Sequence, residues 1–351
     1  AVELTHRNMV ANAWQINHWA GTTIGTESLL AILPFFHSFG LMTCVMYGVA
    51  TACTIIMHHR FSVRNVLKLI DEHQPTIFPI VPRILTALND HLEKKPQKLN
   101  SLRFCISGGA PLDKEVAETF SKYTYATVIE GFGLSEASPV THIGPLDGTA
   151  RPGTIGLPLP DVEARIVDAE TGLKTMPTGE IGELILRGPQ VMKGYWKNPE
   201  ATAEVLRDGW LFTGDLGTCD EDGFFRIVDR KKDLIITSGF NVYPADVEHV
   251  LRQFPGIADV AVIGVPDREF GEIVKAVIAT QPGKELDHSA LKQFCRDNLS
   301  KHKCPQLIET IEGDLPRNFL GKVLRRRLRE KEIHKKPCEV EQTTVTSDVA
   351  E

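Results

Sequence analysis

The sequence of 351 residues has no excess of basic residues and no C-x-x-C pair. Lys and Arg number 39 against 45 Asp and Glu, a formal net charge of −6, so a dedicated nucleic-acid-binding protein is not expected. The seven cysteines are an odd number without zinc-site spacing, which favours a reducing cytosol over a disulfide framework. The hydrophobic share of 42% and the charged share of 24% are ordinary for globular proteins and argue against a disordered chain.

The termini carry no recognisable targeting segment. No basic leader precedes an apolar run, and the last residues are not a peroxisomal tripeptide, so a cytoplasmic location is expected. The chain begins with Ala1 rather than Met, which predicts that it is part of a longer polypeptide.

One stretch, residues 28–57, contains no Asp, Glu, Lys or Arg and is long enough for a transmembrane helix. Pro34, Gly40 and Gly48 interrupt it. We therefore predict a strand at 29–35, a buried helix at 39–50 and a second strand at 53–57 instead of a membrane span.

The pattern of the chain changes twice. Residues 1–150 alternate short apolar runs with amphipathic helical segments, which predicts a parallel α/β sheet covered by helices on both faces. Residues 151–231 carry short strands separated by turns, which indicates a small antiparallel, β-barrel-like subdomain. Residues 232–335 predict a compact α+β domain, and residues 336–351 a disordered tail.

Two glycine-containing segments follow predicted strands, where ligands bind in open parallel sheets. In the first, residues 107–111 (SGGAP), Gly108 and Gly109 would let a flat ligand approach the backbone; the alternative is a simple turn. In the second, residues 130–136 (EGFGLSE), an exposed Phe132 could stack on a base, Ser135 could contact a phosphate and Glu136 could hold Mg²⁺. The alternative there is a glycine-rich turn with a packed phenylalanine and a capping serine.

Three charged positions are weaker signals. Asp215, after the apolar run 210–214, could accept hydrogen bonds from both hydroxyls of a ribose, or could be a turn residue. The charged run 229–233 (DRKKD) is either a solvated face or a ligand-gripping hinge. Lys322, after a glycine in the loop 316–322, could deliver an ammonium group to an anionic transition state, or could be a surface lysine at a helix start.

In this order, the segments resemble the adenylate-forming superfamily, which includes acyl-CoA synthetases, luciferases and peptide-synthetase adenylation domains. The resemblance spans residues 1 to about 332. Its signatures are 33–40 (LPFFHSFG), 107–112, 130–136, 153–160 (GTIGLPLP), 182–202 (GELILRGPQVMKGYWKNPEAT), 210–217 (WLFTGDLG), 229–248 (DRKKDLIITSGFNVYPADVE) and 316–326 (PRNFLGKVLRR). Segments 188–196 and 229–248 look most like bacterial long-chain fatty-acid–CoA ligases, whereas 33–40 also resembles the acyl-[acyl-carrier-protein] synthetases.

The resemblance implies a two-step reaction of a fatty acid with ATP, Mg²⁺ and CoA. The carboxylate attacks the α-phosphate to give acyl-AMP and pyrophosphate, and the CoA thiol then displaces AMP. The implied nucleotide-binding residues are Gly109, Ala110 and Pro111 (adenine and acyl pocket), Glu130, Gly131 and Phe132 (adenine), Ser135 (phosphate), Glu136 (Mg²⁺), and Asp215 and Arg230 (ribose).

The remaining implied roles concern the carboxy-terminal domain and the thiol. Lys322 should bridge the carboxylate and the α-phosphate in the first step. The mobile domain should rotate about Lys232 and bring the loop of Gly239 beside the pantetheine in the second step. His37 should lie near the thiol entry, or is a core histidine.

The chain departs from the pattern at its start. Residues 4–8 (LTHRN) match the positions just after the superfamily's lysine-containing phosphate loop, which would precede Ala1. An inactive nucleotide- or CoA-binding fragment, or a scaffold, is therefore the alternative to an active ligase. The basic segment 322–336 predicts a solvated helix, or contact with CoA phosphates or an anionic membrane surface. A homodimer is a further expectation.

Overall fold

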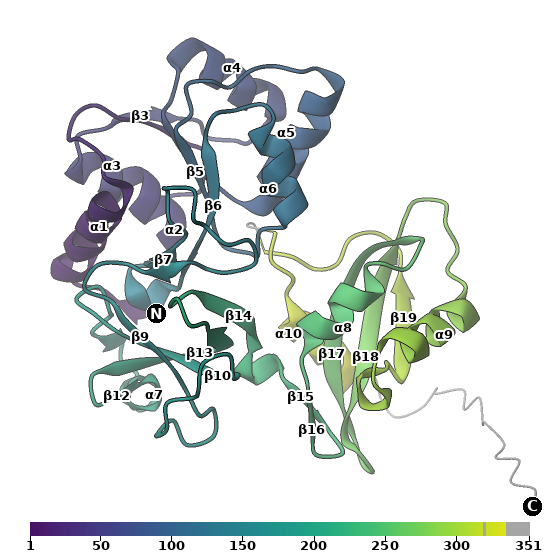
Figure 1. Ribbon diagram of the computed structural model, residues 1–351. Coiled ribbons are helices and arrows are strands. Elements are labelled where there is room, and N and C mark those ends of the chain that lie inside the picture. Colours follow the sequence, from purple (N-terminus) through teal and green to yellow (C-terminus); the bar gives the residue numbers. More distant parts are fainter. Residues whose placement is uncertain (319–320, 335–351) are drawn as a thin grey trace, which may run out of the picture. The chain divides into compact units, whose positions relative to one another are not determined.

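The computed structural model describes residues 1–318 and 321–334, and these form two compact units. The first unit comprises Ala1–Lys232 together with Gly321 and Lys322; the second comprises Asp233–Asn318 and residues 323–334. Figure 1 labels their elements, and each unit is described by itself.

A seven-stranded sheet organises the first part of unit one. Its strands, in spatial order, are β3 (Thr54–Met57), β2 (Ser28–Ala31), β4 (Ile77–Ile80), β5 (Phe104–Ser107), β6 (Thr127–Gly133), β7 (Val140–Ile143) and β8 (Leu157–Pro158). Neighbours from β3 to β6 are parallel, whereas β7 and β8 are antiparallel. The ends of β5 and β6 therefore meet at one edge of the sheet.

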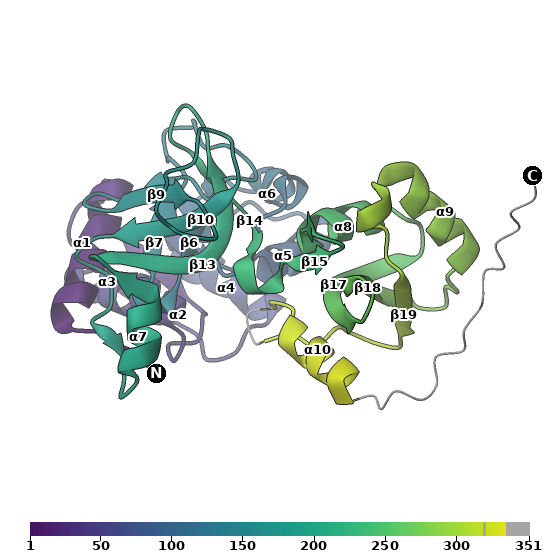
Figure 2. The same ribbon diagram turned by 90° about the horizontal axis from the view of Figure 1, so that it is seen from below.

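Helices cover both faces of this sheet (Figures 1 and 2). On one face, α4 (Val63–His73), α5 (Pro82–Lys94) and α6 (Lys114–Ser121) pack on residues such as Phe78. On the other face, α1 (His6–Ala20) packs on residues such as Ile77. Successive strand residues are buried on opposite sides, which explains the continuous apolar runs. The predicted parallel α/β architecture is confirmed.

The uncharged stretch folds as strand, helix and strand. After β2 the chain turns, then forms one helical segment of α2 (Ser38–Gly40), the π-helical η1 (Leu41–Met46) and α3 (Tyr47–Ala50), followed by β3. The first strand ends at Ala31 and not at residue 35, because Pro34 begins a turn in which its carbonyl accepts the N–H of His37. Within residues 1–318 and 321–334, no helix has the length and apolar content to cross a membrane.

An antiparallel sheet of five strands completes unit one, in agreement with the predicted subdomain. Its strands are β12 (Leu206–Arg207), β13 (Trp210–Cys219), β10 (Gly182–Arg187) and β9 (Glu163–Val167), with β14 (Phe225–Arg230) also paired to β13. The short helix α7 (Pro199–Val205) precedes β12, and β1 (Val2–Glu3) pairs with β11 (Gly194–Tyr195). The 3-10 turns η2 (Ser135–Ala137) and η3 (Lys231–Asp233) follow β6 and β14.

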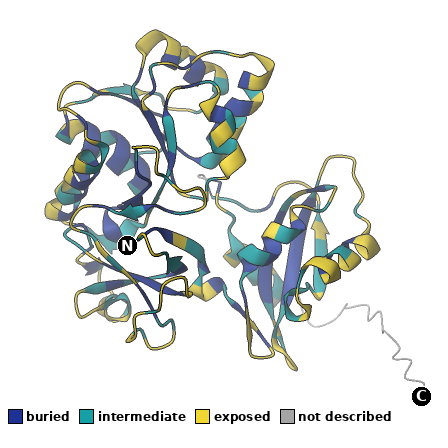
Figure 3. Ribbon diagram, viewed as in Figure 1, coloured by how far each residue is buried: buried dark blue, intermediate teal, exposed yellow. Residues whose placement is uncertain are grey.

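The second unit is an α+β domain, as predicted. Its sheet has the order β16 (Phe240–Val242), β15 (Ile235–Thr237), β18 (Gly271–Thr280) and β17 (Ile257–Asp267), with β19 (Leu307–Ile311) parallel to β18. Its helices are α8 (Pro244–Leu251), α9 (His288–Asn298) and α10 (Arg325–His334), with the turn η4 (Lys301–Lys303). Figure 3 shows β17 and β18 largely buried. The predicted disordered tail, 336–351, lies outside the described residues.

Candidate nucleotide-binding site

The loop after β5 lies beside β6. Gly109, Ala110 and Pro111 form a turn before α6, and the next residue, Leu112, donates its N–H to the Glu130 carboxylate at 3.2 Å. Burial raises the pKa of Glu130 to about 7, and the hydrogen bond from Leu112 opposes that shift. A Cβ at position 108 would lie 3.0 Å from the Phe39 ring, so close packing also favours glycine at this position.

Phe132, on β6, is half-buried and not exposed as predicted. It packs against the core of the antiparallel sheet. In the register of β6 and β7 it faces His142, and the two ring centroids are 6.1 Å apart in an edge contact. His142 also contacts Phe225 at 4.9 Å, and burial lowers its pKa to about 3. A neutral imidazole therefore supports one side of Phe132.

Ser135 begins η2 and contacts the loop of residues 33–40. Its Oγ lies 3.1 Å from the Oγ of Ser38, the first residue of α2. His37 is the N-cap of that helix, and its Nδ1 accepts the N–H of Phe39 at 3.1 Å. His37 is half-buried, and burial lowers its pKa. His37 is thus a half-buried capping histidine, and the next residue, Ser38, contacts Ser135.

Glu136 is held from two sides. Its backbone carbonyl accepts the N–H of Met192, and its Oε1 accepts the hydroxyl of Tyr195 at 2.9 Å. Burial raises the pKa of Tyr195 to about 12, with the Glu136 carboxylate adding to the shift. Sequence reasoning missed Tyr195, although it lies within the 182–202 signature.

Asp215 lies inside β13 and is not a turn residue. It faces Arg230 of β14 in the strand register, and its Oδ1 is 2.9 Å from the Arg230 Nε. The guanidinium N–H is not directed at this oxygen, so the contact is an ion pair rather than a hydrogen bond. Asp215 is only 3% exposed, and its Oδ2 has no hydrogen-bond partner among the described residues. Burial raises its pKa, while the charges of Arg230 and Lys322 oppose the shift.

A β-bulge at residues 213–215 sets the direction of Asp215. The pairing of β10 with β13 shifts between Glu183 and Ile185, so extra residues of β13 leave the ladder. Gly214 takes a φ of 69° there, which favours glycine. Its N–H is accepted by Glu183 at 3.0 Å, and the Thr213 hydroxyl accepts the N–H of Asp215 at 3.1 Å. Sequence reasoning gave Glu183 and Thr213 no role.

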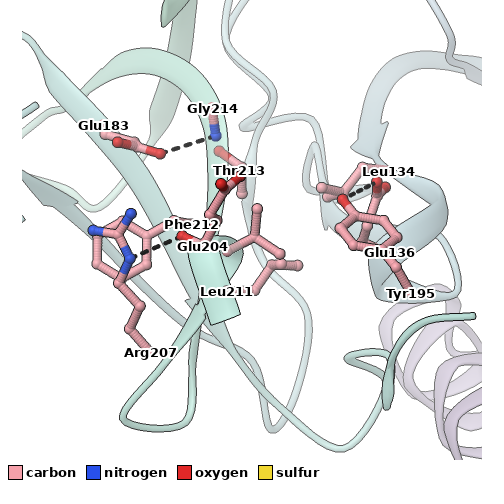
Figure 4. A pocket seen from close by; sticks show the side chains of 11 residues that line it. Leu134, Glu136, Glu183, Tyr195, Glu204, Arg207, Leu211, Phe212, Thr213 and Gly214 are labelled. Atoms are coloured by element: carbon pink, nitrogen blue, oxygen red, sulfur yellow. Dashed lines mark hydrogen bonds between the residues drawn. The ribbon is translucent and has the colours of Figure 1, made fainter. Parts of the chain in front are cut away.

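These groups surround a pocket of about 300 Å³, drawn in Figure 4. Glu136 and Tyr195 line one side, and Glu183, Thr213 and Gly214 line the other. The Glu136 carboxylate acts electrostatically on Asp215, which lies next to Gly214. The lining thus contains the metal candidate Glu136, whereas Ser135, Asp215 and Arg230 are not part of it.

The remaining predicted residues are placed as follows. Lys322 belongs to unit one, and its charge lowers the pKa of Asp215 against the larger effect of burial. Lys232 is the last residue of the main segment of unit one, before Asp233 begins unit two. Gly239 belongs to unit two, where Ser238 and Gly239, with φ of 50° and 80°, form the two-residue turn between β15 and β16.

The Glu136 site suits Mg²⁺ that arrives with phosphates. Mg²⁺ usually takes one or two carboxylates from the protein and its other ligands from phosphates and water. In the part of the chain that the structure describes, no group of three or more His, Cys, Asp or Glu residues forms a metal cage. A single oriented carboxylate such as Glu136 fits the first arrangement.

Comparisons with known proteins agree with this geometry. The family model for the AMP-binding enzyme matches residues 1–196, and the model for the AMP-binding enzyme C-terminal domain matches residues 246–322. A long-chain-fatty-acid–CoA ligase of Bacillus subtilis (strain 168) is 46% identical over 332 residues, which are 94% of this chain and 59% of the relative. The chain thus spans about three fifths of the length of that relative.

Solved structures give the same result. The ATP-bound MatB from Rhodopseudomonas palustris superposes with a TM-score of 0.86 at 36% identity, over 94% of this chain and 65% of that one. The o-succinylbenzoate coenzyme A synthetase (MenE) from Bacillus subtilis, in complex with ATP and magnesium ion, gives 0.82 at 32% identity, over 93% and 66%. Since the first family model alone matches more than half of the chain, this chain belongs to the AMP-binding enzyme family.

Proposed function

We propose that this chain carries the nucleotide site of an AMP-forming acyl-CoA synthetase acting on a long-chain fatty acid. A carboxylate oxygen of the acid attacks the α-phosphorus of ATP, the bond to the β-phosphate breaks, and acyl-AMP and pyrophosphate form. The deprotonated sulfur of CoA then attacks the acyl carbon, and AMP leaves. The name of the Bacillus subtilis relative supports the long-chain fatty acid and CoA as substrates.

The observation that carries this proposal is the buried Asp215. A carboxylate oxygen that is removed from water without a hydrogen-bond partner costs roughly 1–3 kcal/mol, because its desolvation is not compensated. Its Oδ2 has no hydrogen-bond partner among the described residues, and its Oδ1 forms an ion pair with Arg230. A ribose hydroxyl donates the missing bond, and two adjacent hydroxyls can engage both oxygens. The ligand that this site favours is therefore a nucleotide with an intact ribose.

The other anchors extend from the sugar. The accessible side of Phe132 would stack on the adenine, beside Glu130, Gly131 and the turn of Gly109, Ala110 and Pro111. Ser135 would contact a phosphate. Glu136, oriented by Tyr195, would hold the Mg²⁺ that reduces the negative charge of the polyphosphate. Each of these groups positions the nucleotide, which is the main contribution that proteins make to such transfers.

Lys322 would act in the first step and Gly239 in the second. The Lys322 ammonium would bridge the attacking carboxylate and the α-phosphate and stabilise the developing charge. Rotation of unit two about Lys232 would then place the hairpin turn of Gly239 beside the pantetheine for the second step.

The two half-reactions can be tested separately with the 351-residue chain. Palmitoyl-AMP plus CoA should give palmitoyl-CoA, measured by chromatography. ATP, Mg²⁺ and palmitate should release pyrophosphate, measured by a coupled assay. Binding of AMP without turnover in either assay would favour the nucleotide-binding module, and no binding of AMP would reject the proposal. Acids from C4 to C18, with CoA or with acyl carrier protein, then define chain length and distinguish the carrier-protein synthetase alternative.

Replacing Lys322 distinguishes the steps. Lys322→Ala should slow acyl-adenylate formation on the order of 10²–10³, the usual cost of one transition-state donor. It should leave thioester formation from preformed palmitoyl-AMP unchanged. Equal losses in both assays would contradict the proposed role of this lysine.

A further inference from the structure

The bulge that aims Asp215 depends on a side chain from the neighbouring strand. Because extra residues of β13 leave the ladder at positions 213–215, the N–H of Gly214 has no place in the regular pairing with β10. Glu183, on β10, supplies the acceptor: its Oε1 takes this N–H at 3.0 Å (Figure 4). The residue that donates this N–H directly precedes Asp215.

The second oxygen of the same carboxylate binds the residue that follows β14, at the start of η3. Glu183 Oε2 lies 2.8 Å from the Nζ of Lys231, the residue directly after Arg230. Glu183 is 4% exposed, whereas the Lys231 side chain is 44% exposed. One buried carboxylate thus joins the residue before Asp215 to the residue after Arg230.

A buried glutamate is costly to desolvate, yet an apolar side chain at this position could not accept the Gly214 N–H. What the carboxylate adds is a fixed spacing of two backbone segments that carry opposite charges. The β13–β14 register places Asp215 directly across from Arg230. Glu183 contacts the neighbours of both residues, Gly214 and Lys231. These contacts of Glu183 restrain the position of Asp215, whose Oδ2 has no hydrogen-bond partner among the described residues.

We infer, on the basis of the proposed function, that Glu183 and Lys231 are positioning residues for ribose recognition. Their ion pair and the Glu183–Gly214 hydrogen bond keep the Asp215 carboxylate directed at the sugar hydroxyls. Loss of the ion pair between Glu183 and Lys231 lowers the preference for ribose over deoxyribose. The affinity for nucleotides in general falls less.

The test measures the dissociation constants of AMP, 2′-deoxy-AMP and 3′-deoxy-AMP by calorimetry with the 351-residue chain. Glu183→Gln keeps an acceptor for Gly214 but removes the ion pair, and Lys231→Met removes the same pair from its exposed end. Glu163→Gln is the matched control, since it breaks an ion pair with Arg187 at 2.6 Å on the same sheet, where both side chains are about half exposed. Thermal unfolding of each variant checks that it is folded.

The unaltered chain should prefer AMP over each deoxynucleotide by roughly 10-fold or more, as expected for one hydrogen bond to a charged group. Glu183→Gln and Lys231→Met should each lower this ratio about fivefold, and Glu163→Gln should leave it unchanged. A preserved ratio in both folded variants would overturn the inference while the proposed function stands. If the unaltered chain binds AMP without preferring the ribose, the assigned role of Asp215 fails as well, and if it binds no AMP, the proposed function fails with it.

Discussion

The two units surround their buried carboxylates differently. In unit two, Glu248 is 4% exposed, yet its Oε1 accepts the N–H of Val262 at 2.9 Å and pairs with Arg325 at 2.7 Å, and its Oε2 pairs with Arg252 at 3.2 Å. Asp233 pairs in turn with Arg329 at 2.9 Å. The charges of this network are compensated within the unit.

In unit one, Asp215 is as deeply buried but has only the ion pair with Arg230, and one of its oxygens has no partner among the described residues. A complete network stabilises a fold, whereas an incomplete one leaves binding capacity for a ligand. The comparison teaches that burial of a charge does not by itself identify a site, and that a buried carboxylate with an unpartnered oxygen is the stronger indication. It also predicts that substitutions in the unit-two network reduce stability, whereas substitution of Asp215 reduces nucleotide binding.

The largest effect on stability is expected in unit two. Arg325→Met keeps the aliphatic stem but leaves Glu248 and Asp233 without their shared guanidinium, so the free energy of unfolding should fall by about 3 kcal/mol. Denaturant unfolding of the chain measures this loss. Arg326→Met is the control, because that side chain is 90% exposed beside Glu330 and its pair contributes less than about 0.5 kcal/mol. Similar losses in both variants would remove the distinction between the compensated network and an exposed pair.

An effect on binding instead of stability is expected at Asp215. Asp215→Asn should weaken AMP binding roughly 10- to 100-fold, because hydrogen bonds of the ribose hydroxyls to a charged acceptor are lost. The free energy of unfolding should stay constant or rise by about 1 kcal/mol, since a neutral amide is less costly to bury. Calorimetry with AMP and denaturant unfolding measure the two quantities.

Glu248→Gln is the counterpart in unit two. It should lower the free energy of unfolding by about 1–3 kcal/mol and leave AMP affinity unchanged, because its partners are other residues of the fold. If Asp215→Asn destabilises the chain as much as Glu248→Gln does, Asp215 is a structural residue and the proposed ribose contact is wrong.

Much of the fold could be predicted from the sequence, because its signals are local. Ser62 and Asp113, residue types that favour N-caps, cap α4 and α6, and the uncharged stretch 28–57 folds as the strand, helix and strand that its proline and glycines predict. The helix α1 was not predicted, because its buried face is partly polar. Asn12 and Gln15 of that helix are buried and bind the carbonyls of Val140 and Pro160, so apolar periodicity is weak there.

The details of the site depend on pairings between distant segments, which a single sequence does not reveal. The burial of Phe132 follows from the register that places His142 against it. The orientation of the Asp215 side chain depends on a β-bulge and on Glu183, which is 32 residues away in the chain. Asp215 itself was identified through resemblance to a family, and the reading of it as a turn residue failed because the bulge lies within a long strand.

Glu130 is an intermediate case between these two kinds of carboxylate and should show the smallest effect. Burial raises its pKa from the ordinary 4.5 to about 7, and it accepts one hydrogen bond from Leu112. Between these pH values the folded chain binds more protons than the unfolded chain, so its contribution to stability is present below about pH 4.5 and is lost as the pH rises through 7. The full difference corresponds to roughly 3 kcal/mol, which partial exposure reduces to about 1–2 kcal/mol.

Glu130→Gln removes this titration but keeps an acceptor for Leu112. The unaltered chain should therefore lose about 1–2 kcal/mol of unfolding free energy relative to Glu130→Gln between pH 5 and pH 8. Denaturant unfolding of both proteins across this range measures the difference. Parallel curves would mean that Glu130 is ionised in the folded chain over the whole range. It would then resemble the compensated carboxylates of unit two, and Asp215 would be the clearer case in unit one of a buried carboxylate with an oxygen that has no hydrogen-bond partner among the described residues.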